Sequence, residues 1–274
     1  MAKSALAFAP GHISGYFRRV DGRTARETGS LGAGVVTDKG VFVKMTGAKI
    51  TSVKINGQIA DGWLIEKVLD GRTAQVEVTT ELPIGAGFGM SAAGLLASFY
   101  AANELFSLGM TKEDILEATH AIEVESKTGL GDVAAEAGGG IVVRTEPGIS
   151  GVKMRMYPQT ELYALSFGGI KTSDVITSPE KMQQVSAAFP EKLPANVEEF
   201  MANALSFTKK SGLATPRIMK ILDFCASRNI PASMTMLGEG VFAFGPKAKA
   251  ALAQFGMPYA LKVSKTGPYL MEIL

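Results

Sequence analysis

Apolar and polar residues alternate along much of the first 80 residues. The segment 74–80 sets valines between polar side chains, and this period of two predicts a strand with one face in water. Turn signals such as Asn56-Gly57 and Asp61-Gly62 separate the short apolar runs before it. We therefore expect an antiparallel sheet. Its expected strands are 3–9, 34–36, 40–45, 51–55, 63–68 and 74–80, with Pro10-Gly11 ending the first and Trp63 in the core.

Two longer stretches have the composition and spacing of helices. The first is rich in Ala and Leu and runs from Ser91 to Phe106. The second begins after Thr111, an N-cap residue with an acid three positions later, and runs to about Glu125. Along it, His120 and Glu123 lie at the edge of the apolar face. A lone buried carboxylate is costly, so Glu123 is expected to be ion-paired, hydrogen-bonded or bound to a cation.

The order of patterns changes at residues 146–151, Glu-Pro-Gly-Ile-Ser-Gly. We place a domain boundary there, which gives an N-terminal domain over 1–150 and a C-terminal domain over 151–274. The second half alternates strands with helices, an order typical of a small α+β sandwich. Its expected strands are 152–157, 162–167, 232–236, 241–244 and 260–263, and its expected helices are 178–188, 197–211 and 216–228.

Composition narrows the class of protein. With 46% hydrophobic and 20% charged residues, the 274-residue chain is that of a folded protein. A net charge of +2 gives no broad basic surface for nucleic acid. No apolar run approaches about 18 residues and no leader pattern begins the chain, so we expect no membrane partner and a cytoplasmic location. Cys225 is the single cysteine and is expected to be buried. The oligomeric state stays open, and a homodimer is among the states considered.

Three glycines, Gly85, Gly87 and Gly89, stand at alternate positions between the strand 74–80 and the helix that Ser91 begins. Glycine adopts positive φ and lets a ligand approach the backbone, and a helix N-terminus stabilises an anion. A tight strand-to-helix turn explains the same glycines equally well. The loop is not of the Walker type, because no Gly-Lys-Ser/Thr follows, and it lacks the Rossmann spacing.

The sequence Pro83-x-x-x-Gly87-Phe88-Gly89-Met90-Ser91-Ala92-Ala93 resembles the ATP-binding motif of the GHMP kinase superfamily, with Phe88 in place of Leu and Met90 in place of the first Ser. Two further segments resemble motifs of this superfamily, namely Ala9-Pro10-Gly11 and, with fewer glycines, residues 233–242. The resemblance implies ATP and Mg²⁺ as cofactors. The residues it assigns to nucleotide binding are Pro83, Gly85, Gly87, Gly89, Ser91 and Ala92, and those it assigns to Mg²⁺ are Ser91 and Glu123.

The catalytic aspartate of the superfamily lies in a Ser-Gly-x-Asp segment, which Gly129-x-Gly131-Asp132 resembles. Asp132 is therefore expected to act in catalysis together with Ser91 and Glu123, and Glu125 is the alternative metal ligand. Lys127 is a further candidate for stabilising transition-state charge, although a solvated lysine fits it better.

Residues 10–17, Pro-Gly-His-Ile-Ser-Gly-Tyr-Phe, are similar to a signature of archaeal pantoate kinases. This similarity implies pantoate as the acceptor substrate. The residues expected to contact it are His12, Ser14, His120 and Arg144, of which Arg144 suits a carboxylate.

The family resemblance implies an α+β GHMP kinase fold, a two-domain sandwich with mainly antiparallel sheets and a ferredoxin-like C-terminal domain. The implied reaction transfers the ATP γ-phosphate to the terminal hydroxyl of pantoate, giving 4-phosphopantoate, a coenzyme A precursor. Homoserine, shikimate and mevalonate remain alternative acceptors. A non-catalytic ligand sensor of the same fold is the alternative from a different class.

Overall fold

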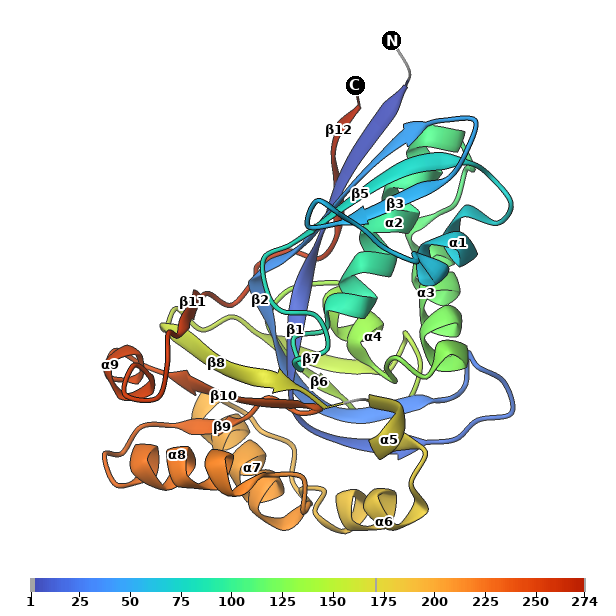
Figure 1. Ribbon diagram of the computed structural model, residues 1–274. Coiled ribbons are helices and arrows are strands. Elements are labelled where there is room, and N and C mark those ends of the chain that lie inside the picture. The colour runs from blue at the N-terminus through green and yellow to red at the C-terminus, as the bar shows by residue number, and fades with distance from the viewer. Residues whose placement is uncertain (1–2, 171, 274) are drawn as a thin grey trace.

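Two long strands, β1 (Ser4–Val20) and β2 (Gly29–Gly47), form the centre of the larger sheet in the computed structural model (Figure 1). The structure describes residues 3–170 and 172–273. The strands follow the order β12-β1-β2-β5-β3-β4, and β6 and β7 continue the sheet from the first half of β2. The remaining members are β3 (Ser52–Ile55), β4 (Gln58–Ile59), β5 (Ala74–Thr80), β6 (Ile141–Arg144), β7 (Val152–Met156) and β12 (Tyr269–Ile273). The pairs are antiparallel except β3 with β5, which confirms the predicted sheet type.

The first strand does not stop at Pro10-Gly11, so that prediction was wrong. The register between β1 and β2 shifts between Pro10 and His12 instead. At this irregularity the His12 backbone N–H donates to the carbonyl oxygen of Phe88 at 2.9 Å. The two predicted runs 34–36 and 40–45 are likewise parts of the single strand β2. The irregularity therefore lies where β1 contacts the glycine loop.

Residues 63–68 are helical, so the strand predicted there was also wrong. Helix α1 (Trp63–Leu69) buries Ile65, Val68 and Leu69, whose three- and four-residue spacings are those of a helix face. Gly62, at φ 68°, precedes the first turn. Trp63 is 45% exposed and is not the core residue that the sequence predicted.

The other helices of the first half stand to one side of the larger sheet (Figure 1). Helix α2 (Met90–Phe106) packs against β1 and β2, and α3 (Lys112–Ser126) packs against α2. The predicted N-cap of α3 is confirmed, because Thr111 and Asp114 form a complete capping box. The short helix α4 (Asp132–Glu136) follows and was not predicted.

A second sheet has the order β11-β8-β10-β9 and is antiparallel throughout. Along the chain it runs strand, helices, two strands, helix, strand, which is the ferredoxin-like arrangement that was expected. Its strands are β8 (Leu162–Gly169), β9 (Ala232–Met234), β10 (Gly238–Phe244) and β11 (Tyr259–Leu261). The helices of this half are α5 (Thr172–Ile176), α6 (Pro179–Ala187), α7 (Val197–Lys210), α8 (Pro216–Ala226) and α9 (Ala248–Leu252).

Helix α7 joins the two layers, because it packs against β9 of the small sheet and β1 of the large one. Cys225 is buried, as predicted. The division at residue 150 stays a prediction, and β7 and β12, which both follow it, pair with strands of the larger sheet. In residues 3–170 and 172–273, no helix is long and apolar enough to cross a membrane.

Candidate active site

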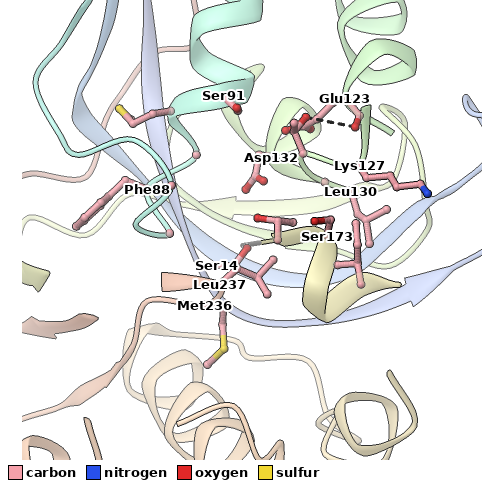
Figure 2. A pocket seen from close by; sticks show the side chains of 18 of the residues that line it. Ser14, Phe88, Ser91, Glu123, Lys127, Leu130, Asp132, Ser173, Met236 and Leu237 are labelled. Atoms are coloured by element: carbon pink, nitrogen blue, oxygen red, sulfur yellow. Dashed lines mark hydrogen bonds between the residues drawn. The ribbon is translucent and has the colours of Figure 1, made fainter. Parts of the chain in front are cut away.

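A cavity of about 520 Å³ opens where the glycine loop, β1, α3 and the small sheet meet (Figure 2). Many of the residues singled out from the sequence line it, although they are distant along the chain. Those residues are Ser14, Gly85, Gly87, Gly89, Ser91, Glu123, Asp132 and Arg144. The other predicted site residues, Pro83, Ala92, His12 and His120, do not line this cavity.

The glycine loop has the backbone conformation that its sequence predicted. Gly85, Gly87 and Gly89 have φ angles of 76°, 81° and 71°, in the left-handed region that favours glycine. Helix α2 begins directly after Gly89, and Ser91 lies in its first turn at the cavity wall. The free N–H groups of this turn and the positive end of the helix dipole suit an anion such as phosphate.

Contacts from distant segments hold the glycine loop in place. The Phe88 side chain is buried and meets Tyr259 edge to face, with 6.0 Å between ring centroids. On the other side lies the turn 235–238, where the Thr235 hydroxyl donates to the Ala86 carbonyl oxygen at 3.4 Å. A Cβ atom at Gly87 would stand 2.8 Å from the carbonyl oxygen of Met236. The predicted motif at residues 233–242 therefore lies against the glycine loop.

Asp132 is the first residue of α4, and His12 on β1 holds its carboxylate. His12 Nδ1–H donates to Asp132 Oδ1 at 2.6 Å, and the histidine ring is buried against Gly34. Burial alone would raise the pKa of Asp132, but the His12 hydrogen bond and nearby positive charge hold that pKa below its ordinary value. Burial lowers the pKa of His12 despite Asp132. The pair is thus a neutral histidine behind an ionised aspartate.

Glu123 on α3 is buried beside Gly129. Neither of its carboxylate oxygens has a hydrogen-bond partner among the described residues. A Cβ atom at Gly129 would overlap Glu123 Oε1. Burial and then the charge of Asp132 raise the pKa of Glu123 well above its usual value, and Arg144 and the nearby backbone N–H of Val133 oppose them. A bound cation would reverse this shift, so the site fits a hard divalent metal ion.

The alternative metal ligand, Glu125, is exposed and does not line the cavity. Within the part of the chain that the structure describes, no three acidic, histidine or cysteine residues cluster as a complete metal site. A metal ion at Glu123 would therefore take its other ligands from the Ser91 hydroxyl, from phosphate oxygens and from water.

Arg144 ends strand β6 and is buried. Its Nη1–H donates to the carbonyl oxygen of Gly131, and its Nη2 has no partner in residues 3–170 and 172–273. Arg144 Nη1 and Ser30 Oγ fill the space that a Cβ atom at Gly131 would need. A buried guanidinium with a free edge at a cavity wall suits an incoming carboxylate.

His120 faces different surroundings. Its Nε2–H donates to the carbonyl oxygen of Thr28 at 2.8 Å. It lines a second, smaller cavity of about 360 Å³ together with Arg26, Glu117 and the loop 146–150. Its predicted contact with the acceptor substrate stays a prediction.

Glu136, which lies one turn after Asp132 on α4, was not predicted as a site residue. Both of its carboxylate oxygens are buried without a partner in the described chain, and a Cβ atom at Gly89 would overlap Oε1. Burial, Asp132 and Glu123 together raise its pKa well above the usual value. The sequence signal that could have identified Glu136 is its four-residue spacing from Asp132. This spacing has meaning only when residues 132–136 are known to be helical.

Helix α4 is held from its C-terminal end by Arg155 of β7. The Arg155 guanidinium donates to the carbonyl oxygens of Ala134, Ala135 and Gly139 at 3.0, 2.9 and 2.7 Å. Lys127, in contrast, is exposed at the cavity rim, and its side chain extends away from Asp132 (Figure 2). The solvated lysine that the sequence favoured agrees with this position.

Known proteins of similar sequence and structure show the family of this chain. The family model of the GHMP kinases N terminal domain matches residues 58–140. The pantoate kinase of Methanospirillum hungatei is 39% identical over 277 residues, covering 97% of this chain and 96% of the relative. The pantoate kinase of Methanocaldococcus jannaschii is 30% identical, with 88% and 92% covered. A solved structure described as a phosphotransferase related to the CoA biosynthesis pathway has a TM-score of 0.80 at 27% identity, with 98% of both chains covered.

Proposed function

The chain belongs to the pantoate kinase family of the GHMP kinase superfamily, and from this premise we propose that it transfers the γ-phosphoryl group of ATP to the terminal hydroxyl of pantoate. The product is 4-phosphopantoate, a precursor of coenzyme A. The observation that carries the proposal is the position of Asp132: an ionised carboxylate at a cavity wall that also holds an anion-binding loop and a buried arginine.

The backbone of the glycine loop and the first turn of α2 bind the triphosphate. Their N–H groups are fixed by the left-handed glycines before any ligand arrives, so binding costs little reorganisation. The Ser91 hydroxyl and the Glu123 carboxylate would hold Mg²⁺, which neutralises charge on the transferring phosphoryl group when bound. Holding these groups in line with the acceptor is most of what phosphoryl transfer requires.

Arg144 and Ser14 bind the acceptor. Arg144 lines the cavity with a buried Nη2 that has no partner among the described residues and would pair with the pantoate carboxylate, and the partly exposed Ser14 hydroxyl faces the same cavity (Figure 2). A carboxylate held there leaves the opposite end of a short acid, its terminal hydroxyl, to face Asp132.

Asp132 acts as the general base. Its Oδ1 is occupied by His12, so Oδ2 accepts the hydroxyl proton as the acceptor oxygen attacks the γ-phosphorus and the bond to the β-phosphate oxygen breaks. His12 is a positioning residue behind Asp132, and this role differs from the substrate contact that the sequence predicted. It keeps the carboxylate ionised and fixes its orientation.

The test is an ADP-release assay of purified protein with MgATP and, in turn, pantoate, homoserine, shikimate and mevalonate. Turnover is expected with pantoate, and Asp132→Asn should lower kcat by about 10²- to 10⁴-fold, the usual contribution of a general base. Preference for another acceptor would refute the substrate assignment. Binding of both ligands without turnover would favour the sensor. The cytoplasmic location and a homodimer stay predictions.

A further inference from the structure

Leu237 combines a strained backbone with an apolar side chain at the main cavity. It lies in the turn 235–238, which joins β9 to β10, and its φ angle is 65°. The left-handed region is costly for a residue with a Cβ atom, and a bulky apolar residue there is an outlier. The partly buried side chain lines the cavity. Strained residues of this kind cluster at ligand sites, so the conformation indicates a function for the side chain.

The other non-glycine residues with positive φ have a local reason for it. In residues 3–170 and 172–273 they are all polar, and each lies in a turn between strands or at the end of a helix. These residues are Asn56, Asp70, Ser107, Lys127 and Asn229. Leu237 is apolar and follows a strand, β9, that ends at Met234. Its conformation therefore does not come from the end of a helix.

A backbone hydrogen bond places Leu237 beside the proposed acceptor site. The N–H of its neighbour Met236 donates to the carbonyl oxygen of Ser14 at 3.3 Å. In Figure 2, Leu237 lies next to Ser14, across the cavity from Ser91. The same turn contacts the glycine loop through Thr235. Leu237 therefore stands near the place where the acceptor would meet the transferring phosphoryl group.

Pantoate has an apolar centre between two polar ends. The carbon next to its terminal CH₂OH group is quaternary and bears two methyl groups. With the carboxylate at Arg144 and the terminal hydroxyl at Asp132, this carbon lies in the cavity between them. Leu130 and Ile176, both buried, line the cavity together with Leu237. The two methyl groups can therefore be removed from water against an apolar wall.

We propose that Leu237 is a specificity-determining residue whose side chain packs on the methyl groups of pantoate. The inference rests on the proposed function, because it requires pantoate in this cavity. The left-handed turn directs the side chain toward the quaternary carbon. An acid of the same chain length without the methyl groups, such as homoserine, leaves a gap beside Leu237 and loses this contact.

The test compares pantoate with 2,4-dihydroxybutyrate, which differs from it only in lacking the two methyl groups. ADP release gives kcat/KM for both acceptors, and the unmodified protein should prefer pantoate by about 100-fold. Leu237→Gly should reduce this preference about 10-fold by lowering kcat/KM for pantoate, within the range for a small hydrophobic contact. Leu237→Asn, which tolerates the left-handed backbone, should do the same. Leu237→Met, which stays apolar, should keep most of the preference.

The remaining outcomes each overturn a stated part. A preference that is absent from the unmodified protein, or unchanged in Leu237→Gly and Leu237→Asn, would refute the role of Leu237 and leave the kinase assignment intact. Equal losses for both acceptors would show that the substitutions disturb the turn, which also refutes it. Failure of the unmodified protein to phosphorylate pantoate would overturn the proposed function and this inference together.

Discussion

Two segments of the chain are rich in glycine, yet particular glycines in them are needed for different reasons. In the loop 82–93, Gly85, Gly87 and Gly89 all have positive φ angles, and no atom lies within 4 Å of a Cβ built at Gly85. In the segment 126–140, Gly129 and Gly131 have no positive φ, and a side chain at either would overlap a buried charged group. Gly85 therefore needs to be glycine for its conformation alone, whereas Gly129 and Gly131 need to be glycine for the space.

This difference follows the chemistry of each segment. The loop 82–93 offers main-chain N–H groups to an anion, and its own Phe88 packs into the core. The segment 126–140 makes room for side chains from other elements, Glu123 of α3 and Arg144 of β6. A glycine-rich composition alone therefore does not reveal whether a loop binds through its backbone or accommodates neighbouring side chains.

Gly131→Ala should break the second segment and give the largest effect. The new methyl group overlaps the Arg144 guanidinium and Ser30 Oγ, so Arg144 must move away from the acceptor. We expect kcat/KM for pantoate to fall about 100-fold, the scale for losing a buried charged contact, and stability to fall by about 1–3 kcal/mol through overpacking. Steady-state kinetics measure the change in kcat/KM, and urea unfolding measures the change in stability.

Gly94→Ala is the control for that substitution. Gly94 lies within α2, has no positive φ, and no atom outside its own helix approaches within 4 Å of a Cβ there. It should be neutral or stabilising by about 0.5–1 kcal/mol. An equal loss of activity in the two variants would contradict the steric explanation.

His12→Leu tests the support behind Asp132. Without the Nδ1–H donor the pKa of Asp132 rises, so the carboxylate ionises only at higher pH. The acid limb of the kcat/KM profile should move to higher pH, and activity at neutral pH should fall by about 20-fold, the scale of a hydrogen bond to a charged group. His12→Asn retains a side-chain N–H donor, so its acid limb and its activity at neutral pH should lie closer to those of the unmodified protein. An acid limb that does not move would show that Asp132 is ionised without His12.

Gly85→Ala sharpens the description of the first segment. The added methyl group meets no atom, so its cost is that of a left-handed conformation, about 1–2 kcal/mol. Because the anion site depends on that conformation, the KM for ATP should rise about 10-fold. Gly71→Ala, at φ 79° and equally open, carries the same cost away from the cavity. Gly71→Ala should lower stability by the same amount as Gly85→Ala and leave the KM for ATP unchanged. A rise in the KM for ATP in Gly71→Ala would contradict the assignment of the anion site to the glycine loop.

Glu136→Gln should give the smallest effect on activity. The pKa of Glu136 is raised in the folded protein. As pH rises above the pKa that Glu136 has in the unfolded chain, the unfolded state therefore loses this proton while the folded state still holds it. Stability of the unmodified protein falls over that interval by up to about 1.4 kcal/mol per pH unit, and glutamine lacks this loss. Urea unfolding should therefore show little difference at acidic pH and a growing advantage for the variant toward neutral pH. A difference that does not vary with pH would contradict a protonated Glu136.

The sequence predicted best what depends on neighbouring residues. The capping box of Thr111 and the left-handed glycines before Ser91 are local, and both are confirmed. The assembly of Glu123, Asp132 and Arg144 at one cavity was accessible only through family resemblance, because no local pattern brings α3, α4 and β6 together.

The failures arise where distant partners decide the structure. Pro10-Gly11 does not end β1, because the Phe88 carbonyl oxygen accepts a hydrogen bond at the irregularity. Trp63–Leu69 is too short an apolar run for its period to separate strand from helix. Helix α4 depends on Arg155, which caps it from 20 residues further along the chain, so the buried position of Glu136 could not be predicted.

The turn 235–238 touches both halves of the cavity. Its Met236 N–H donates to the carbonyl oxygen of Ser14 at 3.3 Å, on the side proposed for the acceptor, and the Thr235 hydroxyl donates to the carbonyl oxygen of Ala86 in the glycine loop, proposed to bind the nucleotide. Leu237 holds a left-handed backbone at φ 65°, which stores strain in the same turn. A nucleotide that shifts this turn also shifts β1 under the acceptor. Thermodynamic reciprocity then requires that the acceptor alter nucleotide affinity by the same factor, whatever the sign of that coupling.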